Sequence, residues 1–167
     1  IGIGSLACEK LSKNSIELGI IPIGAIGLSL FTFDLFLFSS NLSINHPVTA
    51  KTFLSDINNW RLIIDLTMIG ASGGIFSVPF YAAIQDRANP KYLSRIIAAN
   101  NIINAIFMVS ASILAITFLS IGFTIPEFFI LISLMNIFMI VYLNFSSKLF
   151  FDRFINLMKS LSYFDKK

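Results

Sequence analysis

Charged residues are scarce in this chain of 167 residues, because Asp, Glu, Lys and Arg together make up only 13% of it. Soluble domains usually carry about 25% charged residues, and the hydrophobic fraction here is 56%. The composition therefore argues against a soluble globular domain. The low charge together with 18 phenylalanines also argues against an intrinsically disordered chain, which would have few aromatic residues.

The chain has almost none of the cysteines and histidines that form disulfides, metal sites and many catalytic sites. A single cysteine excludes an internal disulfide framework and any zinc site made of several cysteines. The one histidine, His46, has no second histidine or acidic cluster beside it, so we expect no metal and no cofactor. The residue five positions after it is Lys51, not the aspartate of a His-x4-Asp acyltransferase motif. No phosphate-binding loop, nucleotide fingerprint or Ser/His/Asp set occurs, so we expect no catalytic residues in this chain.

The start of the chain lacks the features of a complete membrane protein. It begins at Ile1, without an initiator methionine or a basic leader before an apolar run, so no signal peptide is visible. Residues 1–8 are typical of the last two turns of a helix. We therefore interpret the sequence as part of a longer protein.

Long apolar runs are the main feature that is present. A bilayer core needs about 20 consecutive apolar residues in a helix, and four stretches meet this length, near residues 18–38, 62–84, 96–121 and 125–145. They are too long for the strands of a β-barrel, which have about 10 residues of alternating polarity. Buried helices of a soluble protein are the alternative, but four runs in succession leave no polar face for water. The sequence predicts an all-α polytopic membrane helix bundle with its transmembrane domain in residues 1–146.

The basic residues indicate the orientation of this bundle. All of the twelve lysines and arginines except Lys51 and Arg61 lie before the first full span, between the second and third spans, or after the fourth. By the positive-inside rule these three segments are cytoplasmic. The sequence therefore predicts a cytoplasmic carboxy-terminus and an external loop at residues 39–60.

The tail, residues 147–167, has a pattern of its own. Phenylalanines and leucines recur in it at spacings of three and four, with basic residues around them. This pattern is typical of an amphipathic helix that lies on the inner membrane surface and meets anionic lipid. A plain juxtamembrane linker is the alternative. Because lipid already accounts for the basic residues, we expect no nucleic-acid partner.

Three ionisable residues, Asp34, Arg61 and Asp65, lie in or beside the outer half of the predicted membrane. Arg61 and Asp65 are one helical turn apart, and Asp34 lies one turn from the outer end of its span, where Arg61 could reach it from the next helix. Ionisable residues inside a membrane indicate a functional site by default. These three are therefore candidates for a substrate or polar path. Hydration at the interface is the alternative explanation.

Two other groups are candidates for gating or helix contact. Gly70 and Gly74 form a small-xxx-small pair that lets two helix backbones approach closely, and Pro79 frees a carbonyl and can bend the helix. Ordinary helix packing is the alternative for these residues.

The second group lies at the start of the third span. Asn100 and Asn104 share one helix face, and Asn101 lies beside them. An amide in hydrocarbon needs a partner, so these side chains are expected to face the bundle or a wet cavity. A gate or a latch between helices is the functional interpretation, and ordinary interhelical hydrogen bonding is the alternative.

These two groups lie in segments that resemble a known family. Residues 73–85, Gly-Gly-Ile-Phe-Ser-Val-Pro-Phe-Tyr-Ala-Ala-Ile-Gln, resemble the GGxFxVPLxAxLQ stretch of bacterial lysophospholipid transporters, which belong to the major facilitator superfamily. Residues 95–105, Arg-Ile-Ile-Ala-Ala-Asn-Asn-Ile-Ile-Asn-Ala, are similar to the next part of that family. The beginning of the chain resembles the family's loop between helices eight and nine, with Cys8 and Leu11 at the positions of its usual acid and glycine.

The resemblance implies that the four spans are helices nine to twelve of a transporter in the bacterial inner membrane. It implies lysophospholipid as the cargo, moved for re-acylation, and an amino-terminal transporter half as the missing partner. Because such transporters need two six-helix halves, we expect the chain to be inactive alone. Similar domains begin bifunctional acyltransferase/acyl-carrier-protein synthetase fusions, so a downstream acyltransferase is one alternative, and an exporter of other small molecules is another.

Overall fold

The computed structural model describes residues 1–12, 18–39, 49–146 and 154–156. Every element of these segments is a helix, and they contain no strand. The helix predicted for residues 147–167 lies outside the described residues, apart from residues 154–156. The elements are α1 (Gly2–Ser12), η1 (Leu18–Ile20), α2 (Ile21–Ser39), α3 (Ala50–Ser55), η2 (Ile57–Asn59), α4 (Trp60–Arg87), η3 (Pro90–Tyr92), α5 (Leu93–Ser120) and α6 (Ile125–Ser146).

Four helices in the part of the chain that the structure describes are long and apolar enough to cross a membrane. They correspond to the four predicted runs, and the predicted all-α membrane helix bundle is therefore confirmed. The second and third segments are longer than the sequence predicted, because each begins with a 3₁₀ turn that continues into the long helix. The four segments are Leu18–Ser39, Ile57–Arg87, Pro90–Ser120 and Ile125–Phe145.

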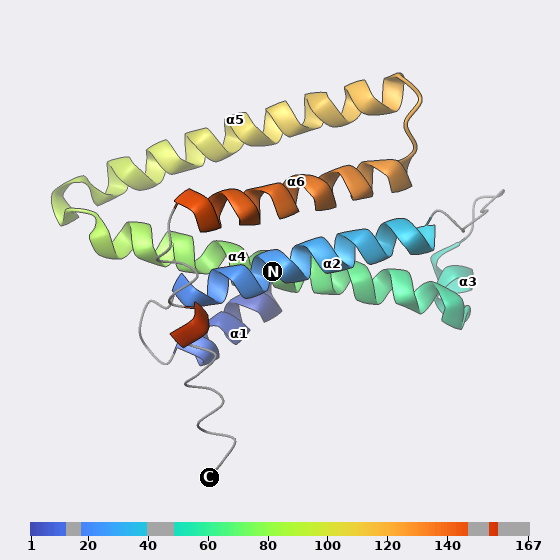
Figure 1. Cartoon of the computed structure of the whole chain (residues 1–167), viewed down its shortest axis with the longest axis horizontal. Coiled ribbons are helices and arrows are strands. Elements are labelled where there is room, and N and C mark those ends of the chain that lie inside the picture. Colours follow the sequence, from blue (N-terminus) through green and yellow to red (C-terminus); the bar gives the residue numbers. More distant parts are fainter. Residues whose placement is uncertain (13–17, 40–48, 147–153, 157–167) are drawn as a thin grey trace, which may run out of the picture.

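Short turns join the last three long helices and make them antiparallel (Figure 1). The Asn89 side chain accepts from the Lys91 N–H at 3.0 Å and caps the turn between α4 and α5. At the start of α6, the backbone N–H of Thr124 donates to Glu127 Oε2 at 2.7 Å, and the Glu127 N–H faces Thr124 Oγ1 at 3.5 Å. This reciprocal pair is a capping box. Gly122, with φ of +101°, makes the left-handed turn that precedes it.

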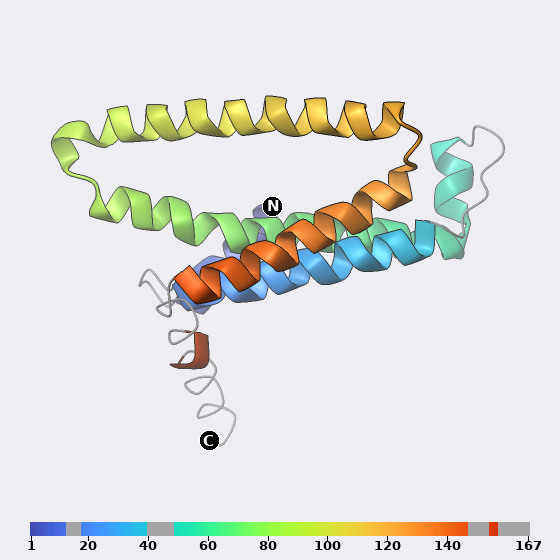
Figure 2. The ribbon, with the colours of Figure 1, turned by 45° about the horizontal axis from the view of Figure 1, so that its top comes forward.

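Helix α2 is the centre of the bundle. It lies beside α4 in both views and packs against α6 on another side (Figures 1 and 2). The buried apolar side chains are concentrated on this helix and on η1, which precedes it. The shorter helix α1 packs against α4. The core residues of the bundle are Cys8, Leu18, Ile20, Ile21, Ala25 and Leu35.

Glycines allow the closest helix approaches in the bundle. A Cβ added to Gly24 of α2 would lie 2.5 Å from the backbone nitrogen of Phe76 in α4. A Cβ on Gly74 would lie 2.5 Å from the carbonyl oxygen of Ile1, and one on Gly70 would lie 3.4 Å from the Ile1 nitrogen. The predicted small-residue pair therefore faces α1, while Gly24 makes the contact of α2 with α4.

Helix α5 differs from the other long helices because none of its residues is buried. It runs apart from α2 and α4 in both views and is joined to its neighbours by turns at its two ends (Figures 1 and 2). Large apolar side chains such as Phe107 and Met108 are about 70% exposed. So large an apolar surface is unusual for a chain in water and is compatible with a lipid environment.

We expect Gly24→Ala to destabilise the protein, because its methyl group would overlap the backbone of α4. Overpacking of this kind costs about 1–3 kcal/mol. Thermal unfolding of the purified protein in detergent measures the effect. Gly73→Ala is the matched control, since the nearest atom to its added Cβ is Leu28 Cδ2 at 4.0 Å. Equal unfolding midpoints for the two variants would contradict the close α2–α4 contact.

Candidate functional site

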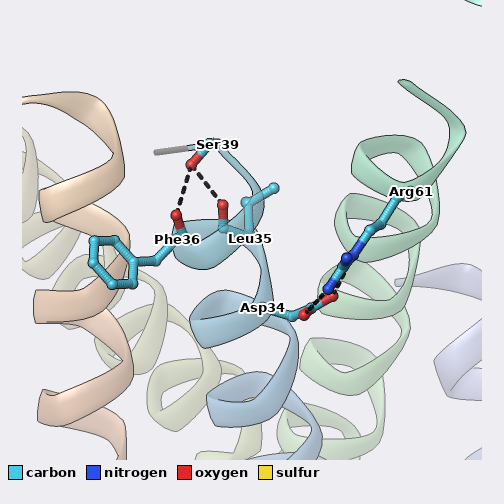
Figure 3. A network of polar contacts seen from close by, with 5 residues as sticks. All are labelled: Asp34, Leu35, Phe36, Ser39 and Arg61. Atoms are coloured by element: carbon cyan, nitrogen blue, oxygen red, sulfur yellow. Dashed lines mark hydrogen bonds and ion pairs between the residues drawn. The ribbon is translucent and has the colours of Figure 1, made fainter. Parts of the chain in front are cut away.

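A bidentate ion pair joins α2 to α4 near the end of the bundle where α2 ends. Arg61 Nη2 donates to Asp34 Oδ1 at 2.5 Å, and Arg61 Nε donates to Asp34 Oδ2 at 3.2 Å (Figure 3). The Arg61 guanidinium also lies over the ring of Phe38, 5.5 Å from its centroid. Both partners of Arg61 belong to α2. The sequence indicated that Arg61 could reach Asp34 from the next helix, and the structure contains this contact.

Asp65 lies one turn beyond Arg61 on α4 and is only 3% exposed. Its Oδ2 atom is buried and accepts no hydrogen bond from the part of the protein that the structure describes. Asp65 shares α4 with Arg61, one helical turn away, and Arg61 pairs with Asp34 of α2. The three candidates for a polar path are therefore one cluster, and Asp65 is buried rather than hydrated at a surface.

Local structure fixes the positions of these side chains. Ser39 Oγ donates to the carbonyl oxygens of Leu35, at 2.5 Å, and Phe36, at 3.4 Å, in the last turn of α2 (Figure 3). The Trp60 indole N–H donates to the Leu54 carbonyl at 3.0 Å. This bond holds α3 against the first turn of α4, one residue before Arg61. Side-chain hydrogen bonds therefore stabilise both the last turn of α2, near Asp34, and the first turn of α4, which carries Arg61.

A second polar group connects α4 to α5. Asn104 Nδ2 donates to the Tyr81 hydroxyl at 2.6 Å. Asn100 and Asn104 line a hollow of about 200 Å³ together with Tyr81 and with Phe76 and Phe80 of α4. Asn101 is exposed and does not line this hollow. Sequence analysis singled out the asparagines but not their partner, Tyr81.

The two polar groups lie far apart. Asp65 and Tyr81 belong to the same helix, and the 16 residues between them correspond to about 24 Å at 1.5 Å per residue. Between them lie the glycine pair that faces α1 and the buried Pro79, through which α4 continues without a break. The structure therefore does not bring the candidate residues into one site but separates them into two halves of the bundle.

A third polar group was missed by the sequence analysis. Asn136 of α6 donates from Nδ2 to the Ala25 carbonyl at 2.7 Å and to Ser29 Oγ at 2.8 Å, both in α2. Ser133 Oγ, which is buried, donates to the Ser29 carbonyl at 3.0 Å. Ser133 and Asn136 are three residues apart and so share a helix face. That spacing of polar residues within an apolar span was the signal that could have identified them.

A largely apolar groove lies between α5 and α6. Its volume of about 500 Å³ is in the range of small-molecule sites. Phe107 and Leu114 of α5 and Phe128 and Met135 of α6 line it, and serines of α5 add a few hydroxyl groups. The arrangement can hold an apolar ligand with little polar recognition.

No cluster of three or more His, Cys, Asp or Glu side chains that could bind a metal occurs in residues 1–12, 18–39, 49–146 and 154–156. No family model, curated protein or solved structure matches the chain. The fold and its polar groups define a class only: a multi-pass, all-α membrane protein with an ion pair between two of its apolar spans.

We expect Asn136→Leu to weaken the packing of α2 against α6, because it removes two interhelical hydrogen bonds and leaves the acceptors on α2 without this donor. Such bonds contribute up to about 1.7 kcal/mol in membrane proteins. The free energy of unfolding in detergent measures the loss. Asn101→Leu, at an exposed position of α5, is the control and should change stability much less. A larger loss in the control would contradict the assigned contact.

Proposed function

We propose that the chain is part of a membrane transporter that moves lysophospholipid across the inner membrane of a bacterium for re-acylation. The observation that carries this proposal is the ion pair of Asp34 with Arg61 between two apolar spans, with the buried Asp65 one turn from Arg61. Ionisable residues within membrane spans are costly and usually mark paths of substrates or ions. A bundle that served only as an anchor would gain nothing from a buried carboxyl group at position 65.

The groove and the ion pair support an amphipathic cargo. A lysophospholipid has one acyl chain and a phosphate-bearing head. The groove between α5 and α6 offers apolar walls for an acyl chain, and the partly exposed Arg61 offers a guanidinium, which binds phosphate well. The substrate class itself rests on the resemblance of residues 73–85 and 95–105 to lysophospholipid transporters.

The distribution of charge supports the proposed orientation. The turn between α4 and α5 and the start of α2 lie at one end of the bundle, and α3 and the turn between α5 and α6 lie at the other (Figure 1). Arg87, Lys91 and Arg95 belong to the first end, which we place in the cytoplasm by the positive-inside rule. The charged cluster then lies in the outer half of the membrane, and the pair of Tyr81 and Asn104 lies in the inner half.

Two polar groups in opposite halves suit alternating access. Transporters of the proposed type work by rocking one helix bundle against another around a central site. The exposed surface of α5 supports a role for further helices of the same transporter, which would cover it. We therefore propose that the chain works only together with a second transporter half and is inactive alone.

We expect Asp34→Asn in the intact transporter to reduce lysophospholipid transport about tenfold or more, which corresponds to about 1.4 kcal/mol. The physical reason is that the variant leaves Arg61 without its carboxylate partner. Movement of labelled lysophospholipid to the inner leaflet of proteoliposomes measures the rate, and immunoblotting of membranes measures the amount of protein.

The matched control for this experiment is Glu127→Gln, which removes an acid but keeps a side chain that can complete the capping box of α6. It should transport at the normal rate. Full activity of Asp34→Asn at a normal amount of protein would remove the ion pair from the proposed mechanism.

A further inference from the structure

We propose that the hollow between α4 and α5 recognises the free glycerol hydroxyl of a lipid with one acyl chain, and that the groove between α5 and α6 holds that chain. The inference rests on the proposed function and deepens it, because it names the group that distinguishes a lysophospholipid from a phospholipid with two chains. It assigns a role in specificity to Tyr81, Asn100 and Asn104, which line the hollow.

The hollow and the groove lie along one face of α5. Asn100 and Asn104 line the hollow, and Phe107, Ala111 and Leu114 line the groove. These residues follow one another at spacings of four, three, four and three, which places them on one side of the helix. A molecule on this face therefore meets amide groups first and then apolar side chains over about 15 Å, the axial distance from Asn104 to Leu114.

The side chains around the hollow suit a hydroxyl group. None of the described side chains that line it is charged, and three of them carry aromatic rings. The bond from Asn104 Nδ2 to the Tyr81 hydroxyl uses one amide proton of Asn104, but neither its carbonyl oxygen nor the Tyr81 proton. The Asn100 amide adds a further donor and acceptor. A free hydroxyl both donates and accepts, whereas the ester oxygens of a second acyl chain only accept.

The turn between α4 and α5 supplies positive charge on the other side of the hollow. Ile84, which lines the hollow, lies three residues before Arg87, and Arg95 lies five residues before Asn100. Both arginines are therefore within about 8 Å of the hollow along the helix axes, and guanidinium groups bind phosphate well. The exposed charged residues of the turn are the acid Asp86 and the bases Arg87, Lys91 and Arg95.

The order of these surfaces matches the order of groups in a lysophospholipid. The basic turn would meet the phosphate, the hollow the glycerol hydroxyl and the groove the acyl chain. In the orientation proposed above, this lipid has its head toward the cytoplasm, as in the inner leaflet. Arg61 lies 20 residues before Tyr81 on α4, about 30 Å away, so one lipid head does not reach both. The hollow is thus the position of the cargo after it has crossed the membrane.

Photolabelling of the intact protein in lipid nanodiscs tests the site without transport. The probe is lysophosphatidylethanolamine with a diazirine in its acyl chain, and mass spectrometry of peptides locates the label. We expect the label within residues 107–115 and 128–135, which contain the lining of the groove. Label spread evenly over the apolar surfaces of all the long helices would overturn the proposal.

Competition tests recognition of the hydroxyl in the same nanodiscs. Unlabelled lysophosphatidylethanolamine should compete at least about tenfold better than its analogue with a methyl ether in place of the free hydroxyl, at equal amounts in the nanodisc. The reason is that the analogue cannot donate and leaves an acceptor of the hollow unpaired. Equal competition by the two lipids would show that the hollow does not read the hydroxyl.

Tyr81→Phe is the sharpest variant, because it removes one hydroxyl and keeps the ring. It should weaken competition by lysophosphatidylethanolamine about tenfold and leave competition by the methyl ether unchanged. Tyr142→Phe, at an exposed position of α6, is the matched control and should behave like the wild type. No loss in Tyr81→Phe, or an equal loss in the control, would contradict the assignment. The wild-type comparison of the two lipids is decisive even if Tyr81→Phe does not fold.

Transport in proteoliposomes separates this inference from the proposed function. The wild type should move lysophosphatidylethanolamine at least about tenfold faster than the methyl ether. A wild type that transports both lipids equally would overturn the role of the hollow and leave the proposed function intact. A wild type that is labelled in the groove and prefers the hydroxyl, but transports neither lipid, would contradict the proposed function and leave the binding site intact.

Discussion

Lipid offers no hydrogen bonds, so polar groups in the spans of this chain must find partners within the protein. This constraint explains how the long helices are joined. The ion pair of Arg61 with Asp34 joins α4 to α2, Asn136 joins α6 to α2, and Asn104 joins α5 to Tyr81 of α4. Asp65 Oδ2 is the buried side-chain oxygen of the described residues that has no partner.

Small residues complement these polar contacts. Where α2 crosses α4, Gly24 lets the backbones approach more closely than any side chain would permit, and Gly74 does the same for α1. Helix association in lipid depends on such close packing, because lipid is as apolar as the side chains and provides no hydrophobic driving force. Helix α5 lacks contacts of this kind and is held by its terminal turns and by Asn104. Its apolar surface consequently remains exposed.

Much of the fold could be predicted because the signals are local. The apolar runs contain few charged residues and are long enough to span a membrane, and short segments separate them. Part of the candidate site could be predicted as well, since Asp34 and Arg61 lie at similar depths on consecutive spans. The contact of Ser29 with Asn136 is different, because it joins residues 107 positions apart. No local pattern shows which face of α6 meets α2.

The sequence by itself determined the helical class, the number of apolar spans and their approximate ends, because these depend on hydropathy and turn residues within about 20 positions. Only the tertiary structure decided which polar residues meet. It paired Arg61 with Asp34 rather than with Asp65, exposed Asn101 while Asn104 met Tyr81, and buried one oxygen of Asp65. The physical reason is that the rotation and axial position of each helix follow from side-chain packing between distant segments.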